Sequence, residues 1–181
     1  MKYLFASDIH GCAISAQKLK DKFLEEKADF LVLCGDILYH GPRNDLPDGY
    51  NPKKVIEILN SISDKIIAVR GNCDTEVDQM VLDFPMLCDY TVIVDEGLRI
   101  FVTHGHIFNE NNPLKISGKD IIVSGHTHIL KAEELNGTAY LNPGSVSIPK
   151  GGNPKTYMIY DNKTFIIKDF SGNIITEKDV R

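Results

Sequence analysis

Five short motifs in this chain carry side chains of the types that bind metal ions, and each motif directly follows a short apolar run. A single D-x-H or H-x-H motif is weak evidence, because such residues are also common in surface turns. Five separate apolar runs that all end in a ligand-type residue are hard to obtain by chance, so the set predicts a metal site. The motifs are Asp8-Ile9-His10, Gly35-Asp36, Gly71-Asn72, His104-Gly105-His106 and Gly125-His126-Thr127-His128.

The donor atoms of these motifs indicate which ions and which chemistry they suit. Seven candidate ligands are too many for one zinc ion and fit two divalent metals. Nitrogen and oxygen donors without sulfur favour Mn2+, and Fe, Zn2+ or Ni2+ also fit. Two such ions carry four positive charges, of which Asp8 and Asp36 neutralise two, so the site would attract an anion and acidify a bridging water. The predicted ligands are Asp8, His10, Asp36, Asn72, His104, His126 and His128.

Short runs rich in β-branched residues supply the strands that position these motifs. Their nearly continuous hydrophobicity indicates strands that are buried on both faces. Helical patterns over residues 14–27 and 55–62 separate the first three runs, which predicts a β-α-β-α-β unit with a parallel sheet. The second helix is predicted to begin with Asn51 as its N-cap and Pro52 at its first position. Because ligands bind at the carboxyl ends of such strands, we expect the motifs to meet at one edge. The predicted strands are Lys2–Ser7, Phe30–Cys34, Ile66–Val69, Arg99–Thr103 and Ile121–Ser124.

Hairpin signals dominate the C-terminal half of the chain. Asp95-Glu96-Gly97, Asn136-Gly137 and Asp161-Asn162-Lys163 each lie between apolar runs, and Asn-Gly is the strongest of these signals. This half is therefore predicted as an antiparallel meander. The sequence contains no internal repeat and no linker, which predicts one domain over residues 1–181 with two packed sheets and outer helices.

Composition and charge argue against several classes of protein. The net charge of −5 gives no basic field that would recruit nucleic acid, so no stable nucleic-acid partner is expected. The longest apolar runs are far shorter than the ~20 residues that cross a bilayer, so no membrane association is expected. Four cysteines without a C-x-x-C pair, together with the lack of a signal peptide, favour the cytoplasm and free thiols.

The motif set resembles that of the calcineurin-like metallophosphoesterase superfamily and, within it, the bacterial and archaeal YfcE-type phosphodiesterases. The resemblance runs from about Met1 to Tyr160 and includes Gly71-Asn72-Cys73-Asp74 and the segments 35–44 and 141–145. It implies an α/β fold, a four-layer α/β/β/α sandwich of two mixed sheets flanked by helices. It also implies that Asp36 bridges two metals. One metal would be held by Asp8, His10 and His128, and the other by Asn72, His104 and His126.

Cys73 departs from the pattern of the wider superfamily, whose protein phosphatases carry a histidine there as the general acid. A thiol with a reference pKa of ~8.5 is a poorer acid, so poor leaving groups would be expelled slowly. His106 and His40 are the candidate replacements, although His106 could equally orient a ligand and His40 could be a solvated loop residue. Arg43 and Asn44 could bind a phosphoryl oxygen or simply face solvent.

The leading functional hypothesis is a metal-dependent phosphodiesterase that hydrolyses a small phosphodiester with a hydroxide bridging two metals. A phosphomonoesterase or nucleotidase is the alternative, and the lack of a histidine at position 73 counts against it. A non-catalytic scaffold, as in the retromer subunit of similar fold, would tolerate an eroded ligand set, whereas all seven positions are intact here. A homo-oligomer is left open. The predicted catalytic residues are Asp36, Asn72 and His106, and the predicted substrate contacts are His40, Arg43 and Cys73.

Overall fold

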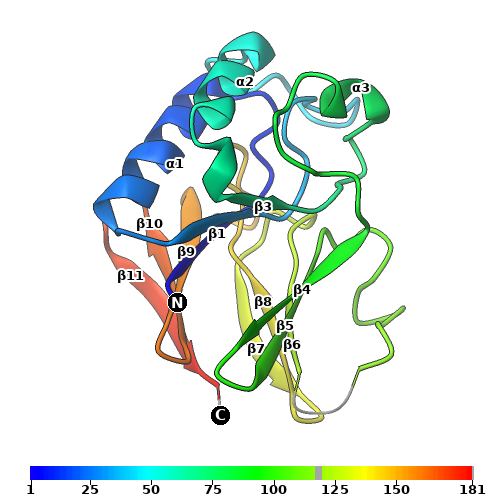
Figure 1. Ribbon diagram of the computed structural model, residues 1–181, viewed down its shortest axis with the longest axis vertical. Coiled ribbons are helices and arrows are strands. Elements are labelled where there is room, and N and C mark those ends of the chain that lie inside the picture. The colour runs from blue at the N-terminus through cyan, green and yellow to red at the C-terminus, as the bar shows by residue number, and fades with distance from the viewer. Residues whose placement is uncertain (117–119, 181) are drawn as a thin grey trace.

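Two mixed β-sheets pack against each other in the computed structural model, which describes residues 1–116 and 120–180 (Figure 1). The helices are α1 (Ala13–Glu25), α2 (Pro52–Asn60), the 3-10 turn η1 (Ser63–Lys65) and the short α3 (Glu76–Gln79). The first sheet contains β1 (Tyr3–Ala6), β2 (Phe30–Leu33), β3 (Ile66–Ala68), β9 (Thr156–Asp161), β10 (Thr164–Asp169) and β11 (Ile174–Asp179). The second contains β4 (Tyr90–Asp95), β5 (Leu98–Thr103), β6 (Ile121–Val123), β7 (Lys131–Leu135) and β8 (Thr138–Asn142).

The N-terminal β-α-β-α-β unit is confirmed, with β1, β2 and β3 parallel and adjacent in the sheet order β11-β10-β9-β1-β2-β3. All four residues of β1 are buried because the strand has a packed layer on each face. Leu4 and Ala6 belong to the core under the helices, whereas Tyr3 and Phe5 belong to the core between the sheets. This double burial explains why the run lacks the polar alternation of a half-exposed strand.

Local sequence signals define the two long helices. The side chain of Asn51 accepts a hydrogen bond from the Lys54 N–H over 3.2 Å, and Pro52 occupies the first turn of α2, as predicted. The buried face of α2 carries Val55 and Leu59, which pack into the core that α1 also covers. No helix within residues 1–116 and 120–180 is long and apolar enough to cross a membrane.

The prediction of an antiparallel meander for the C-terminal half is wrong for the second sheet. Its order is β4-β5-β6-β8-β7, and β6 pairs parallel with both β5 and β8. Parallel neighbours need a long crossover, and here the chain crosses over between β5 and β6 and again, through β7, between β6 and β8. The β9-β10-β11 part is an antiparallel meander, but it extends the first sheet, where β9 pairs with β1.

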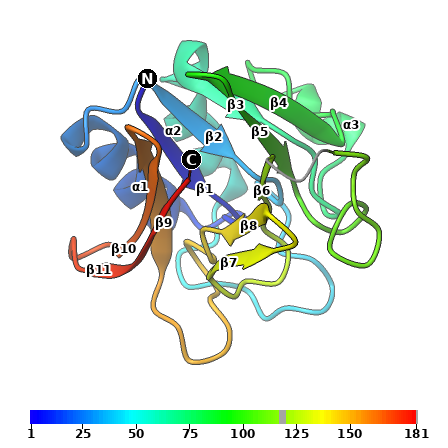
Figure 2. The same cartoon turned by 90° about the horizontal axis from the view of Figure 1, so that it is seen from below.

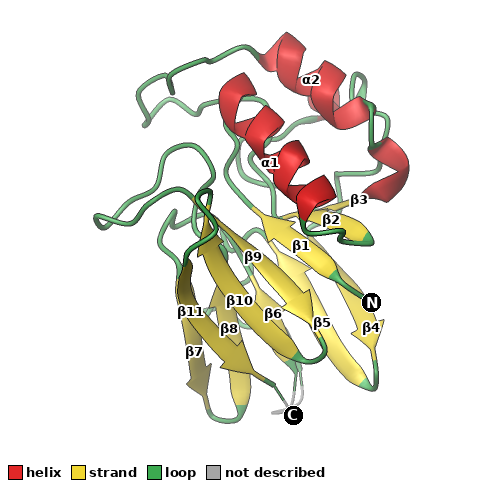
Figure 3. Ribbon diagram, turned by 90° about the vertical axis from the view of Figure 1, so that its left-hand side faces the viewer, coloured by secondary structure: helices red, strands yellow, loops and turns green. Residues whose placement is uncertain are grey.

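The arrangement of layers confirms the α/β class with two mixed sheets. Helices α1 and α2 lie together on one side of the first sheet, away from the second sheet (Figure 1). In Figure 2, seen from below, β9 and β10 of the first sheet lie on the side of α1, whereas β7 and β8 of the second sheet lie farther from it. Figure 3 shows the helices gathered on one side of the molecule. The helical covering is thus concentrated on the first sheet, which leaves the strand ends and their loops free to form a site.

Candidate metal centre

The predicted ligands lie where strands of both sheets end, and backbone hydrogen bonds join their loops. The N–H of Asp8 donates to Gly35 O over 3.1 Å, and the N–H of Gly125 donates to His104 O over 2.9 Å. The N–H of His126 donates to Asp8 Oδ2 over 3.1 Å, which connects the two sheets directly. Strands of the first sheet are followed by Asp8, His10, Asp36 and Asn72, and strands of the second by His104, His126 and His128.

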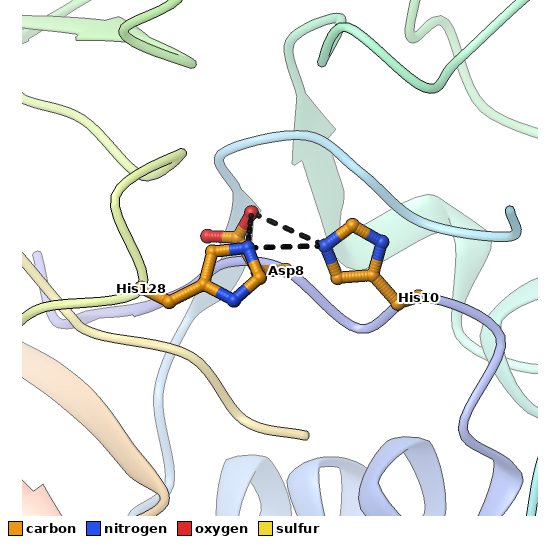
Figure 4. Close-up of side chains that lie close together, drawn as sticks. All are labelled: Asp8, His10 and His128. Atoms are coloured by element: carbon orange, nitrogen blue, oxygen red, sulfur yellow. Dashed lines mark hydrogen bonds and ion pairs between the residues drawn. The ribbon is translucent and has the colours of Figure 1, made fainter. Parts of the chain in front are cut away.

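Asp8, His10 and His128 form a compact, buried group (Figure 4). The Nε2 atoms of the two imidazoles lie 3.2 Å apart. Asp8 Oδ1 lies 3.3 Å from His128 Nε2 and 3.7 Å from His10 Nε2. None of the three side chains is more than 3% exposed, so bulk water cannot solvate these polar atoms.

Hydrogen bonds to backbone carbonyls determine the tautomers of three histidines. The Nδ1 atoms of His10, His104 and His128 lie 2.8, 2.6 and 2.7 Å from carbonyl oxygens of residues 39, 34 and 148. Because a carbonyl only accepts, each Nδ1 carries a proton, so each ring in its neutral form turns its Nε2 lone pair toward the centre. Asp8 Oδ1 faces the same point and has no hydrogen-bond partner among the described residues. Buried acceptors that face one another repel, and a cation between them removes the repulsion.

Asp36 connects this group to a second one. Its Oδ2 atom lies 3.6 Å from His10 Nε2 and 3.4 Å from His104 Nε2. Asn72 Oδ1 lies 3.1 Å from His104 Nε2, so the amide oxygen and the imidazole nitrogen face each other. Three sets in the described part of the chain have the spacing to hold an ion: Asp8–His10–His128, Asp8–Asp36–His104 and His10–Asp36–Cys73. His126 is in none of these described sets, and its ring centroid lies 5.1 Å from that of His104.

Five of the predicted ligands have a left-handed backbone, which the sequence does not reveal. This region is uncommon for residues other than glycine and costs roughly 1–2 kcal/mol per residue. Such strain persists only where the surrounding structure compensates for it, and it is concentrated at functional sites. The φ angles are 60° at Asp8, 48° at His10, 56° at Asp36, 68° at His126 and 60° at His128.

Comparison with known proteins identifies the family that shares these motifs. Residues 1–164 match the family described as the calcineurin-like phosphoesterase superfamily domain. The chain belongs to this superfamily. Phosphodiesterase YfcE of Escherichia coli (strain K12) is 50% identical to it over 162 residues, which cover 90% of this chain and 88% of YfcE.

Solved structures of the superfamily confirm the fold. The structure of Yfce, a phosphoesterase from E. coli, aligns with this chain at a TM-score of 0.98 and 46% identity, and the alignment covers 100% of both chains. Vps29 of Entamoeba histolytica, solved in complex with zinc, aligns over 99% of both chains with a TM-score of 0.64 at 22% identity, which is a similarity of fold alone. The predicted superfamily and hydrolase class are therefore confirmed, and membership in a metallophosphoesterase family implies divalent metals.

Electrostatics in the centre of this phosphoesterase favour a cation. Burial opposes ionisation of Asp8 and Asp36, but the neighbouring imidazoles stabilise the negative charge more strongly and lower the pKa of both carboxyls. Burial likewise opposes protonation of His104, yet the Asp36 carboxylate raises the pKa of this imidazole to about 9. The pKa of His10 is raised for the same reason, with Asp8 as the main partner. The site therefore attracts protons when no metal is present, and a divalent ion satisfies the same charges.

A cleft of about 290 Å3 lies beside the predicted ligands. Its lining includes the side chains of Asn72, Cys73, His126 and His128 and two cations, Arg43 and Lys150. Neither cation has an ion-pair partner among the described residues, so both charges are available to an anion in the cleft. Burial and the nearby Asp36 charge raise the pKa of the Cys73 thiol to about 12.

The structure places the two remaining histidines outside the described lining of this cleft. The His40 ring lies between Tyr39 and Tyr50, with centroid separations of 4.7 and 5.4 Å. The His106 ring lies 5.3 Å from that of His104, and burial followed by the His104 charge lowers the pKa of His106. The Nδ1 atoms of His40 and His106 are buried without a hydrogen-bond partner in the described residues. Their roles in binding and catalysis stay predictions.

Asp74 is a supporting residue that the motif reading missed. Its buried carboxylate accepts hydrogen bonds from the backbone N–H groups of Asp36, Ile37 and Gly71 at 2.8, 2.9 and 2.8 Å. These bonds join the loops after β2 and β3 and hold Asp36 at the centre. Burial outweighs these donors and raises the pKa of Asp74 to about 6. The signal available in the sequence was only an acidic residue two positions after Asn72.

Ser145, Ser147 and Lys150 are the other missed residues, and all belong to the loop between β8 and β9. The hydroxyls of Ser145 and Ser147 donate to the carbonyl oxygen of Asp8 over 2.9 and 2.7 Å. They thereby compensate for the strained backbone of Asp8. Lys150 reaches the cleft because its backbone N–H donates to His128 O over 3.0 Å. Such long-range contacts have no local sequence signal.

Proposed function

We propose that this chain is a metal-dependent phosphodiesterase that hydrolyses a small phosphodiester at a centre of two divalent ions. Mn2+ is the favoured ion, and Fe, Zn2+ or Ni2+ can substitute for it. The observation that carries the proposal is the convergence of buried acceptor atoms on Asp8 Oδ1, which has no hydrogen-bond partner among the described residues. The E. coli relative, half identical to this chain, carries the name phosphodiesterase.

The proposed ligands form two groups that share Asp36, whose Oδ2 faces His10 on one side and His104 on the other. When bound, two divalent ions lower the pKa of a water molecule and neutralise charge on phosphoryl oxygens. One ion is assigned to Asp8, His10, His128 and Asp36, and the other to Asn72, His104, His126 and Asp36. The fixed tautomers of the histidines prepare their Nε2 atoms for this task.

The cations of the cleft are assigned to substrate binding. Arg43 can form two parallel hydrogen bonds to a phosphoryl group, and Lys150 supplies a second positive charge on the other loop of the cleft. A monoanionic diester would thus be drawn to the centre although the chain carries a net charge of −5.

Cys73 favours diesters with good leaving groups over other substrates. Because burial and Asp36 raise the pKa of its thiol to about 12, Cys73 is a weak acid and a poor proton donor to a departing alkoxide. His106 has a lowered pKa and is therefore neutral near pH 7, which suits a proton acceptor better than a donor. Monoesters are the second candidate substrates, because their hydrolysis needs a site that accepts a dianion and a general acid that protonates the leaving group.

The test of this proposal is turnover of an activated aryl phosphodiester by protein reconstituted with Mn2+. Asp36→Ala should lower kcat by roughly a thousandfold or more and reduce the metal content, because both ions lose a shared ligand. Asp45→Ala, the same substitution at an exposed acid of the neighbouring loop, is the matched control and should keep wild-type values. Full turnover by Asp36→Ala would rule out the two-metal assignment.

Two further measurements separate the alternatives. The ratio of diester to monoester turnover at saturating metal decides between a phosphodiesterase and a phosphomonoesterase or nucleotidase. Elemental analysis after reconstitution decides between an enzyme and a scaffold, because a scaffold need not bind two ions per chain.

A further inference from the structure

The thiol of Cys73 lies at the edge of the metal centre and belongs to a separate set of ligand atoms. Its Sγ lies within 4.8 Å of one donor atom each of His10 and Asp36. These two side chains are 1% and 3% exposed, so the set is buried apart from the cysteine. A thiol, an imidazole and a carboxylate form a donor set that suits a thiophilic divalent ion better than Mn2+.

Neighbouring groups hold the sulfur in this position. The backbone N–H of Cys73 donates to Asp36 Oδ1 over 2.8 Å, which ties the cysteine to a member of the set. The Nδ2 group of Asn72 donates to Cys73 Sγ over 3.3 Å, so the sulfur already acts as an acceptor. Gly41 packs closely on the other loop, because a Cβ atom there would stand 3.0 Å from Cys73 Sγ. The sulfur is therefore confined between the loops after β2 and β3.

The buried side of the same set contains acceptors without a donor. His10 donates through Nδ1 to a backbone carbonyl, so in the neutral ring the Nε2 lone pair faces Asp36 Oδ2 at 3.6 Å. Asp8 Oδ1 lies 3.7 Å from this nitrogen and has no hydrogen-bond partner among the described residues. These acceptors favour a cation whether or not Cys73 takes part. They lie around His10 Nε2, which faces Asp8 and Asp36 and belongs to the residue that shares a ligand set with Cys73.

We propose that Cys73 is an alternative metal ligand, which binds a thiophilic divalent ion such as Cd2+ or Zn2+ together with His10 and Asp36. On binding, the S–H bond breaks, the proton passes to solvent and a sulfur–metal bond forms, with no change of oxidation state. Because His10 and Asp36 are also ligands in the two-ion assignment, the two arrangements exclude each other. Thiophilic ions therefore compete with Mn2+ for the centre.

Co2+ is the spectroscopic probe for this arrangement, because a cobalt–thiolate bond gives a charge-transfer band in the near ultraviolet. Titration of the metal-free, full-length protein with Co2+ should produce this band, and Cys73→Ser should abolish it. Cys88→Ser, at an exposed cysteine away from the described sets, is the matched control and should keep the band. Circular dichroism of both variants checks that they are folded.

Competition against a chromophoric chelator gives a second readout. Cys73→Ser should weaken Cd2+ binding by roughly tenfold or more and leave Mn2+ binding nearly unchanged. Wild-type protein that binds Co2+ without the band, or Cys73→Ser protein that keeps it, would overturn the proposal. These readouts need no substrate, so loss of diester turnover would contradict the proposed function without touching this assignment.

Discussion

Gly71 lies against the carboxylate that is assigned to both metals, and Gly71→Ala tests the importance of this contact. A Cβ atom at Gly71 would stand 2.1 Å from Asp36 Oδ1 and 2.3 Å from Asp36 N, whereas ordinary contacts begin at 3.4 Å. Because one of the clashing atoms belongs to the backbone, rotation of the Asp36 side chain cannot relieve the overlap. Asp36 must move by about 1 Å.

The expected losses of stability and of turnover in Gly71→Ala follow from this displacement. Overpacking of this kind costs about 1–3 kcal/mol of the free energy of unfolding. A misplacement of 1 Å at a reacting centre lowers the rate by about 100-fold. We therefore expect Gly71→Ala to fold with reduced stability, to bind metal more weakly and to lose about 100-fold in diester turnover.

The assay combines denaturant unfolding, elemental analysis and kcat/KM for an activated aryl phosphodiester. Gly97→Ala in the β4–β5 turn is the matched control, since a Cβ atom there meets nothing within 4 Å although φ is +83°. This control should lose about 1 kcal/mol through its left-handed backbone and keep full turnover. Wild-type turnover and metal content in Gly71→Ala would refute the argument that this glycine is needed for the position of Asp36.

Three further predictions concern the cleft and the charges. Cys73→His, which supplies a better general acid, should raise monoester turnover relative to diester turnover by roughly tenfold or more in a steady-state assay with both substrates. Lys150→Ala should raise KM for the diester about two- to fivefold at low salt with little change in kcat, whereas the exposed Lys155→Ala should change neither. Metal-free protein should lose stability to thermal unfolding as the pH rises from about 6.5 to about 9. The reason is that the folded pKa of His104 is raised from its ordinary value of 6.5 to about 9, so its stabilising protonated form is lost over this window. A thermal stability of the metal-free protein that does not change with pH over this window would contradict the role of His104 protonation.

The sequence predicted the elements that have strong local signals. The double burial of β1, the parallel β1–β3 unit and the Asn51-Pro52 start of α2 follow from hydrophobic pattern and capping, and the structure has all three. The gathering of the ligand motifs at the strand ends was predicted from the geometry of parallel sheets. These features depend on residues close together in the chain.

The features that the sequence did not reveal depend on contacts between distant segments. The parallel pairing of β6 with β5 and β8 requires crossovers without helical periodicity, so the hairpin signals around them suggested a meander instead. The left-handed backbone of Asp8 is supported by Ser145, which lies far along the chain. Asp74 and Lys150 likewise act through backbone hydrogen bonds whose partners only the fold brings close.

The position of β9 beside β1 has a consequence for the order in which this enzyme is completed during synthesis. Strand β1 is made first, but its partner on one side is β9, which ends at Asp161. The proposed ligands His126 and His128 also emerge in the second half of the chain. Until then the N-terminal unit has an unpaired edge at β1 and an incomplete set of metal ligands. The nascent chain would therefore complete the proposed metal centre late, after both sheets have been synthesised, and early release would yield a fragment with an incomplete ligand set and an exposed strand edge.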